Sequence, residues 1–133
     1  MTLSAQTDLT STPPALLADL PSLGMDAKSL ALDFRQYFSH TLGRDQYGTP
    51  PHCFYTALAL TLRDRLVERW KATNAAYDAS GCKRTYYLSL EFLMGRALSN
   101  AVLNLGIADE ATRALHQLGL LMEEVAEEEH DAG

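Results

Sequence analysis

One short run of residues constrains the fold of this chain more than any other feature. Residues 84–92 (RTYYLSLEF) are dense in strand-forming residues and lack helical spacing, which predicts a β-strand. A lone strand leaves hydrogen-bonding groups along both edges, and Tyr86–Leu90 is too apolar for an exposed edge. We therefore expect the first strand of a parallel sheet whose other strands are not in this sequence.

Before this strand the chain follows helical spacing. A first helix is predicted from Asp26 to Leu42, because Asp26 can accept hydrogen bonds from the first-turn N–H groups and Gly43 suits the left-handed position after the last turn. The apolar residues recur at i, i+4, i+7 and i+8, which indicates one buried face. They are Leu30, Phe34, Tyr37 and Phe38.

A second, longer helix is predicted to run to about Tyr77. Thr49 would cap it, and Pro50 supplies the backbone angle favoured at the first helical position. Such a helix is about 40 Å long and exceeds the width of so small a domain, so part of its apolar stripe needs a surface beyond this chain. The stripe consists of Phe54, Leu58, Leu62, Leu66 and Trp70, widened by Tyr55 and Val67.

Three shorter helices are predicted after the strand. One spans Arg96–Leu105 and ends at Gly106, a residue suited to a left-handed turn. Another is capped by Asp109 and ends at Gly119, and a last, acidic helix covers Leu120–Glu129. The predicted fold class is thus mainly α with one β-strand, as the N-terminal part of an incomplete α/β protein.

Three segments can be distinguished along the chain. Residues 1–24 are rich in Ser, Thr and Pro and are predicted to be a mobile N-terminal tail. Residues 25–82 form the two-helix segment. Residues 83–133 contain the strand and the short helices that follow it.

The net charge of -6 comes from the end of the chain. Over residues 1–122, eleven basic residues balance eleven acidic ones, so the excess lies in the last eleven residues. This acidic run is interpreted as a solvated helix face. A neutral body with an acidic end offers no basic surface for nucleic acid or an anionic membrane. No apolar run approaches the roughly 18 residues that span a bilayer, so neither partner is expected.

Cysteine usage and the N-terminal charge pattern bear on the compartment. Cys53 and Cys82 stand far apart and form no Cys-x-x-Cys pair, which fits a reducing environment better than a disulfide scaffold. The first 24 residues lack Lys and Arg, whereas secretory and transit leaders need positive charge. We therefore expect a cytoplasmic protein.

A long series of residues resembles the start of the α-1,4-glucan phosphorylases, the family of glycogen, starch and maltodextrin phosphorylases. The resemblance covers residues 26–133 in the family's order and spacing, which makes it far more specific than a short motif. The residues that carry it are TP (49–50), RDRLVERW (63–70), KRTYYLSLEFLMGRALSNAVLNLG (83–106), LGL (118–120), MEE (122–124) and EEHDAG (128–133).

The resemblance implies a longer enzyme with two large α/β domains of the glycosyltransferase-B type. It implies transfer of a glucosyl unit from a glucan to inorganic phosphate, giving glucose 1-phosphate, in a homodimer. It also implies pyridoxal 5′-phosphate, held as a Schiff base by a lysine that is not in this sequence. The chain alone is therefore expected to be inactive and to bind no cofactor, with the remainder of a phosphorylase as its partner.

Three residues around the end of the predicted strand are the candidate site residues. Ligands of open α/β sheets sit beyond the carboxyl ends of the strands, where Glu91 would lie, and the resemblance implies a carboxylate beside the active site there. Pairing of Glu91 with Arg96 or with an amide of the turn is the alternative. The resemblance also implies that Leu93 and Gly95 lie near the cofactor pocket, although some relatives carry tyrosine at the position of Leu93.

Regulatory features match less well. The serines of the tail have no Lys or Arg nearby to pair with a phosphate. Asp78 stands where the resemblance implies stacking on a nucleotide activator, and an aspartate cannot stack. Asp45 lies in the connector 43–49, which resembles a loop that touches the partner subunit. A solvated loop is the alternative.

Two other functions compete with an enzyme fragment. Glu127 and His130 form a Glu-x-x-His pair, but a bundle metal site needs a second such pair, so no metal site is predicted. The main alternative is a non-catalytic helical interaction protein, for example a remnant that binds a full-length phosphorylase by adding its strand to a sheet edge.

Overall fold

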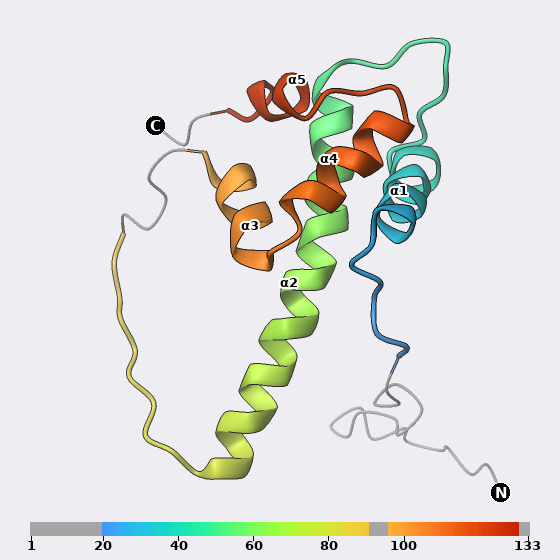
Figure 1. Ribbon diagram of the computed structural model, residues 1–133. Helices are drawn as coiled ribbons and strands as arrows, with labels where there is room; N and C mark the ends of the chain where they lie inside the picture. Colours follow the sequence, from blue (N-terminus) through green and yellow to red (C-terminus); the bar gives the residue numbers. More distant parts are fainter. Residues whose placement is uncertain (1–19, 91–95, 131–133) are drawn as a thin grey trace, which may run out of the picture.

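The computed structural model describes residues 20–90 and 96–130, which form five α-helices and one π-helical turn (Figure 1). The prediction of a mainly helical chain is confirmed for these residues. The elements are α1 Ala27–Gln36, η2 Tyr37–Thr41, α2 His52–Ser80, α3 Ala97–Leu105, α4 Ala108–Gln117 and α5 Met122–Glu127.

Helix α1 begins where the sequence predicts and ends earlier. Asp26 caps it, because its Oδ1 accepts the N–H groups of Lys28 and Ser29, both at 3.0 Å. The Ser29 hydroxyl also donates to Oδ2, and this bond holds the pKa of Asp26 below its ordinary value. The α-helix ends at Gln36, and the predicted last turns, up to Leu42, form the wider turn η2 instead.

A stack of three aromatic rings accompanies the π-helical turn. The Phe38 ring lies between Phe34, at a centroid distance of 6.3 Å, and Phe54, at 5.4 Å, and the rings are nearly parallel. The Leu42 N–H donates to the Tyr37 carbonyl oxygen five residues earlier, at 2.9 Å, which is the bond of a π-helix. The apolar face predicted for this segment thus packs α1 and η2 onto the start of α2.

Helix α2 starts later than predicted. Thr49 is not its cap, because the Thr49 hydroxyl donates to the Asp45 carbonyl oxygen at 2.7 Å and is already satisfied within the connector. Pro51 occupies the N-cap position without a side-chain hydrogen bond. At the other end the helix extends to Ser80 and stops at Gly81, whose left-handed φ of 59° suits a glycine.

The core lies between α1, the first half of α2 and the three short helices (Figure 1). α4 packs against α1, and α3 and α5 pack against α2. Leu58 and Leu62 are buried, which places the first half of the predicted α2 stripe in the core. The other buried apolar residues are Leu30, Ala31, Phe34, Cys53, Ala57, Leu98, Val102, Leu105, Ile107, Ala111, Ala114, Leu115 and Val125.

Helices α3 and α4 stop where predicted, whereas α5, Met122–Glu127, is shorter than the predicted Leu120–Glu129, and one predicted cap is wrong. Gly106 and Gly119 follow α3 and α4 with left-handed φ angles of 72° and 77°. Asp109 does not cap α4, because Ile107 stands at the N-cap and Asp109 lies inside the first turn. Its carboxylate is still favourable there, since it faces the positive end of the helix dipole.

The second half of α2 projects away from the core (Figure 1). We call residues 66–90, this half-helix with the chain that follows it, the distal arm, and residues 22–65 with 96–130 the helical core. In the distal arm Leu66, Trp70 and Tyr77 are exposed. The prediction that part of the α2 stripe lacks cover within the chain is confirmed for the residues described.

The predicted strand is wrong for the part of it that the structure describes. Residues 84–90 form no strand but a drawn-out loop (Figure 1), in which Tyr86 is 77% exposed and Leu88 is 91% exposed. A strand exists only through a ladder to a neighbouring strand, and no second strand occurs in residues 20–90 or 96–130. Strand-forming composition cannot replace that neighbour. Residues 91 and 92 lie outside the described residues.

The end of the predicted N-terminal tail is held against α2. The Arg65 guanidinium donates to the Gly24 carbonyl oxygen from Nε at 2.9 Å and from Nη2 at 2.6 Å. One turn further along, the Glu68 carboxylate accepts the Leu23 N–H at 3.2 Å. Residues 1–19 lie outside the described residues, so the division into three segments stays a prediction.

Candidate functional site

The candidate site residues Glu91, Leu93 and Gly95 lie outside the residues that the structure describes. Their roles, and the alternative pairing of Glu91 with Arg96, therefore stay predictions. The structure does describe the element that follows these residues in the sequence, helix α3, which begins at Ala97.

An acidic side chain from the end of the chain holds the start of α3. Glu129 Oε1 accepts the Ala97 N–H at 2.8 Å, and Oε2 accepts the Leu98 N–H at 3.1 Å. The interpretation of the acidic run as a solvated helix face is therefore wrong for Glu129. Its partners lie 32 and 31 residues away in the sequence, and no local pattern reveals such a contact.

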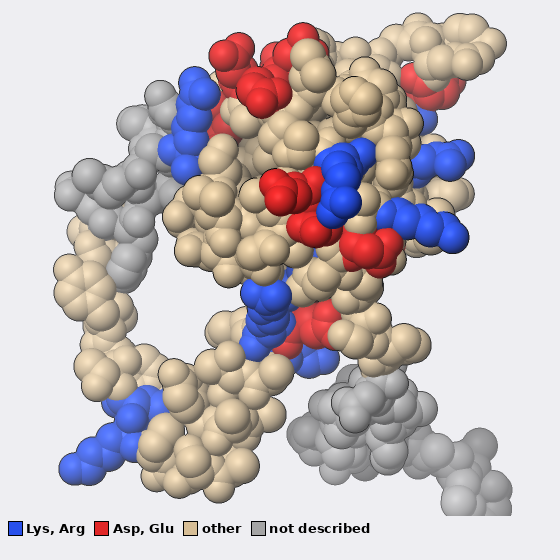
Figure 2. Space-filling model, viewed as in Figure 1, with Lys and Arg blue, Asp and Glu red and all other residues tan. Residues whose placement is uncertain are grey.

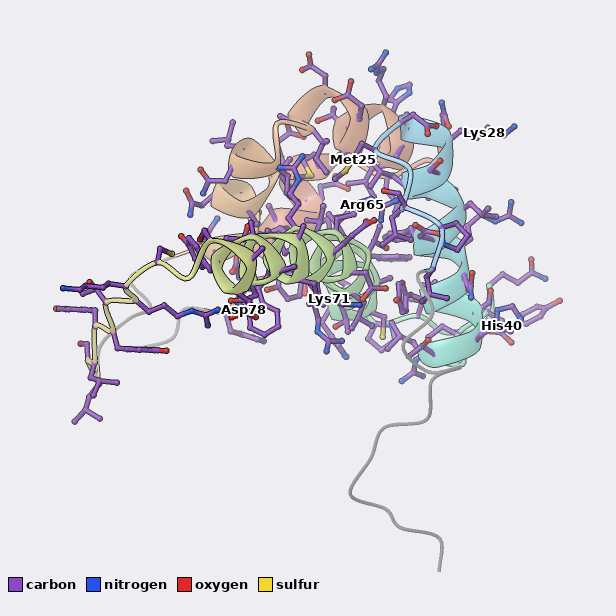
Figure 3. All side chains as sticks on the ribbon, turned by 90° about the horizontal axis from the view of Figure 1, so that it is seen from below. Met25, Lys28, His40, Arg65, Lys71 and Asp78 are labelled. Atoms are coloured by element: carbon purple, nitrogen blue, oxygen red, sulfur yellow. The ribbon has the colours of Figure 1, made fainter. Side chains whose placement is uncertain are left out.

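Arg65 is a second important residue that the sequence analysis missed. Its side chain is fully buried between α2 and α1 (Figure 3). Nη1 donates to the Thr61 carbonyl oxygen at 2.8 Å, and Nη2 donates to Asp33 Oδ2 at 2.7 Å. A buried guanidinium needs such partners, because an unpaired buried charge is strongly destabilising. A signal was present in the sequence, since Arg65 follows Leu58 and Leu62 at the spacing of the buried face.

Two more polar contacts hold α2 against the segments before it, one in the helical core and one at the start of the distal arm. The Tyr37 hydroxyl donates to Asp64, and this bond together with burial raises the pKa of Tyr37 to about 12. Glu68 accepts hydrogen bonds from the Ser22 side chain and the Leu23 N–H, which hold its pKa below the ordinary value. Both carboxylates are engaged as acceptors within the fold, so this cluster does not form an acid–base pair facing a substrate.

At the tip of the distal arm, side chains around Tyr77 line an open pocket of about 380 Å³. The Arg84 guanidinium pairs with Asp78 and lies over the Tyr77 ring, 5.7 Å from its centroid. Asp78, the position at which the resemblance implies nucleotide stacking, is therefore engaged in an ion pair. The adjacent Tyr77 ring is covered on one face by Arg84.

The other predicted positions make local contacts. Asp45 Oδ1 accepts the Tyr47 N–H at 2.9 Å in an exposed turn, a geometry that fits both a partner contact and a solvated loop. Cys53 is buried with its Sγ 3.7 Å from His52 Nε2, whereas Cys82 is exposed. Within residues 20–90 and 96–130, no group of three metal-ligating side chains occurs. None of the helices described is long and apolar enough to cross a membrane.

Comparison with known proteins shows the class to which this chain is similar, which is the phosphorylases. The chain is 44% identical over 108 residues, or 81% of its length, to the muscle form of glycogen phosphorylase from Rattus norvegicus. It is 44% identical over 114 residues, or 86% of this chain, to the brain form from Homo sapiens. It is 47% identical over 100 residues, or 75% of this chain, to the liver form from Bos taurus. No family model matches the chain.

More particularly, the chain is a fragment-sized match to the N-terminal region of a glycogen phosphorylase. The matched segment spans 13% of the length of the muscle and brain forms and 12% of the liver form. The family resemblance predicted from the sequence is thereby confirmed. About seven-eighths of the length of such a relative lies outside the match.

Proposed function

We propose that this chain serves as the N-terminal part of an α-1,4-glucan phosphorylase. The proposed reaction transfers a glucosyl unit from the non-reducing end of glycogen or maltodextrin to inorganic phosphate, with glucose 1-phosphate as the product. The observation that carries the proposal is the identity of 44–47%, over three quarters or more of this chain, to glycogen phosphorylases. The chain alone is proposed to be inactive.

The residues of this chain do not fit pyridoxal phosphate by themselves. A Schiff base needs a lysine amine in an enclosed pocket, and all three lysines, Lys28, Lys71 and Lys83, are exposed. Figure 3 shows Lys28 directed away from the core. We therefore propose that the remainder of a phosphorylase holds the cofactor. The candidate roles are retained: Leu93 and Gly95 near the cofactor pocket and Glu91 near the active site.

The distal arm is the surface proposed to contact that remainder. Leu66, Trp70 and Tyr77 are exposed along it, and a contiguous apolar surface on a protein commonly marks an interaction site. Residues 86–90 would form the predicted strand once a neighbouring sheet edge is present. A homodimeric and cytoplasmic enzyme with two glycosyltransferase-B-type domains completes the proposal and rests on the family resemblance.

The alternative function is a non-catalytic helical interaction protein that binds a full-length phosphorylase. It is favoured by the exposure of the strand-forming residues Tyr86, Leu88 and Leu90, because an extended segment can add to the edge of another protein's sheet. The two functions differ in whether binding restores activity.

A complementation experiment tests the proposal and separates it from the alternative. This chain is mixed with rat muscle phosphorylase from which the matching 108 residues have been removed. Each protein alone should be inactive. The mixture should release glucose 1-phosphate from glycogen and phosphate, and it should show the absorbance of bound pyridoxal. Leu88→Asp in the distal arm should abolish this activity, whereas Leu103→Asp, an exposed residue of α3, should leave it unchanged.

The remaining outcomes are also informative. Binding of the chain to intact phosphorylase without activity in the mixture would favour the interaction protein. Absence of both binding and activity would overturn both functions. Glucose 1-phosphate release by the chain alone would contradict its proposed inactivity.

A further inference from the structure

Helix α3 lacks a local cap at its N-terminus. Arg96 stands at the N-cap position and makes no side-chain hydrogen bond to the first turn. The first N–H groups of a helix have no partner within the helix, so they need one elsewhere. Here the N–H groups of Ala97 and Leu98 donate to the two carboxylate oxygens of Glu129. A residue more than thirty positions later therefore does the work of a cap.

The charge and the surroundings of Glu129 favour this contact. A carboxylate at a helix N-terminus interacts favourably with the helix dipole, and Glu129 is half-buried. The Tyr55 hydroxyl of α2 faces the same carboxylate. Burial, and then the charge of Glu129 and its hydrogen bond, raise the pKa of Tyr55. The Glu129 N–H donates to the Ala126 carbonyl oxygen at 3.3 Å, so one residue links α2, α3 and the end of α5.

We propose that Glu129 is a positioning residue that fastens the end of α5 to the first turn of α3 and to α2. It thereby fixes the start of α3 relative to the chain that follows α5. The candidate site residues directly precede α3 in the sequence, and we take their placement to follow that of its first turn. This last step rests on the proposed function, and in a complete phosphorylase Glu129 would act through α3 rather than by contact with substrate.

The contact itself can be tested on the full chain by nuclear magnetic resonance. Glu129→Ala removes both acceptors, and amide exchange at Ala97 and Leu98 should become about five- to tenfold faster, as expected for loss of a cap. Glu129→Gln keeps one acceptor but not the charge and should have a smaller effect. Exchange at the core residues Leu62 and Leu115 should not change.

The pKa of the Tyr55 side chain gives a second readout, and unchanged exchange at the core amides separates it from a general loosening of the fold. In Glu129→Gln the pKa of Tyr55 should fall towards its ordinary value without reaching it, because burial is the larger cause of the shift. Glu127→Gln is the matched control, since Glu127 is an exposed acidic residue of α5, and it should leave both readouts unchanged.

Several results would overturn the positioning role. These are unchanged exchange at Ala97 and Leu98 in both Glu129 variants, equal acceleration at the core amides, or the same effect in Glu127→Gln. A spectrum of the unaltered chain without dispersed amide signals would also count against it, because the contact requires α3 and α5 to be packed.

The complementation assay then separates this inference from the proposed function. Glu129→Ala should lower kcat of the mixture by about tenfold with little change in KM for glycogen, as for loss of one positioning contact. Full activity of the variant would reject the link to the site while leaving the contact intact. No activity in the mixture with the unaltered chain would reject the proposed function, and the resonance results would still decide the contact.

Discussion

Leu62 and Trp70 lie on the same apolar stripe of α2, two helical turns apart, yet Leu62 is 2% exposed and Trp70 is 65% exposed. Leu62 belongs to the helical core, where α1 and the short helices cover the stripe. Trp70 belongs to the distal arm, where the described residues cover the stripe only in part. The local pattern is the same in both regions, so burial depends on what packs against the helix and not on the helix itself.

Charged residues differ between the two regions in the same way. In the helical core Arg65 is fully buried and shared by three acceptors, whereas in the distal arm the Arg84–Asp78 pair is largely open to solvent. Figure 2 shows acidic side chains gathered over α5 and basic ones at the tip of the distal arm. Exposed ion pairs contribute little to stability, so we expect the Arg84–Asp78 pair to add little to the stability of the distal arm.

The largest expected effect comes from truncating the same stripe in each region. Leu62→Ala should destabilise the chain by about 3 kcal/mol, because it leaves a cavity in a packed core. Trp70→Ala should change the free energy of unfolding by less than about 0.5 kcal/mol, since its side chain packs on little. Urea unfolding followed by circular dichroism measures both. Similar losses for the two variants would mean that the distal arm is packed in solution.

A smaller effect is expected from the charged residues. Arg65→Leu should cost about 2 kcal/mol, because Asp33 and the Gly24 carbonyl oxygen lose a charged donor. Arg69→Leu, at an exposed position four residues further along α2, should stay within about 0.5 kcal/mol. Thermal unfolding at neutral pH compares them. Equal stability of Arg65→Leu and the unaltered chain would show that the buried network contributes nothing net.

The Tyr37–Asp64 bond should contribute about 1 kcal/mol, measured as the loss of stability in Tyr37→Phe. Because the pKa of Tyr37 is raised from 10.0 to about 12, the folded state holds this proton more tightly than the unfolded state. Its contribution is therefore complete below pH 10 and is lost as the pH rises towards 12. Tyr37→Phe should lack this alkaline loss, whereas the exposed Tyr47→Phe variant keeps the bond and should lose stability with pH as the unaltered chain does. Identical alkaline profiles for both variants would contradict the bond.

The smallest effect concerns the caps. Asp26→Ala should lower the melting temperature more than Asp109→Ala, because only Asp26 accepts first-turn N–H bonds. The pKa of Asp26 lies below 3.8, so its contribution is present above that pH and is lost as the pH falls through the lowered value. Melting curves from pH 7 to pH 2 should converge for Asp26→Ala and the unaltered chain. A constant difference down to pH 2 would mean that the carboxylate charge is not the cause.

Features that depend on neighbouring residues could be predicted from the sequence. The cap at Asp26 and the stops at Gly106 and Gly119 follow from side chains within one turn of the helix end. Thr49 failed as a cap because another local acceptor, the Asp45 carbonyl oxygen, competes for its hydroxyl. The strand failed because its defining hydrogen bonds must come from outside the described residues.

The candidate site was less accessible to sequence reasoning. Glu91, Leu93 and Gly95 stay predictions, whereas Glu129 and Arg65 emerged only from the structure. The contacts of Glu129 link residues 31 and 32 positions apart, which no periodicity encodes. Arg65 could have been found, because a charged residue on the apolar face of a helix must be buried with partners or distort the packing.

The anchoring of only one half of α2 has a mechanical consequence. From Arg65, where the helix is fastened, to its last residue Ser80, the axis runs about 22 Å. A tilt of about 10° at the anchored end would therefore swing the free end by about 4 Å, because a stiff helix does not absorb the rotation along its length. Small repacking movements around the buried Arg65 guanidinium would therefore produce larger displacements at the last turns of α2.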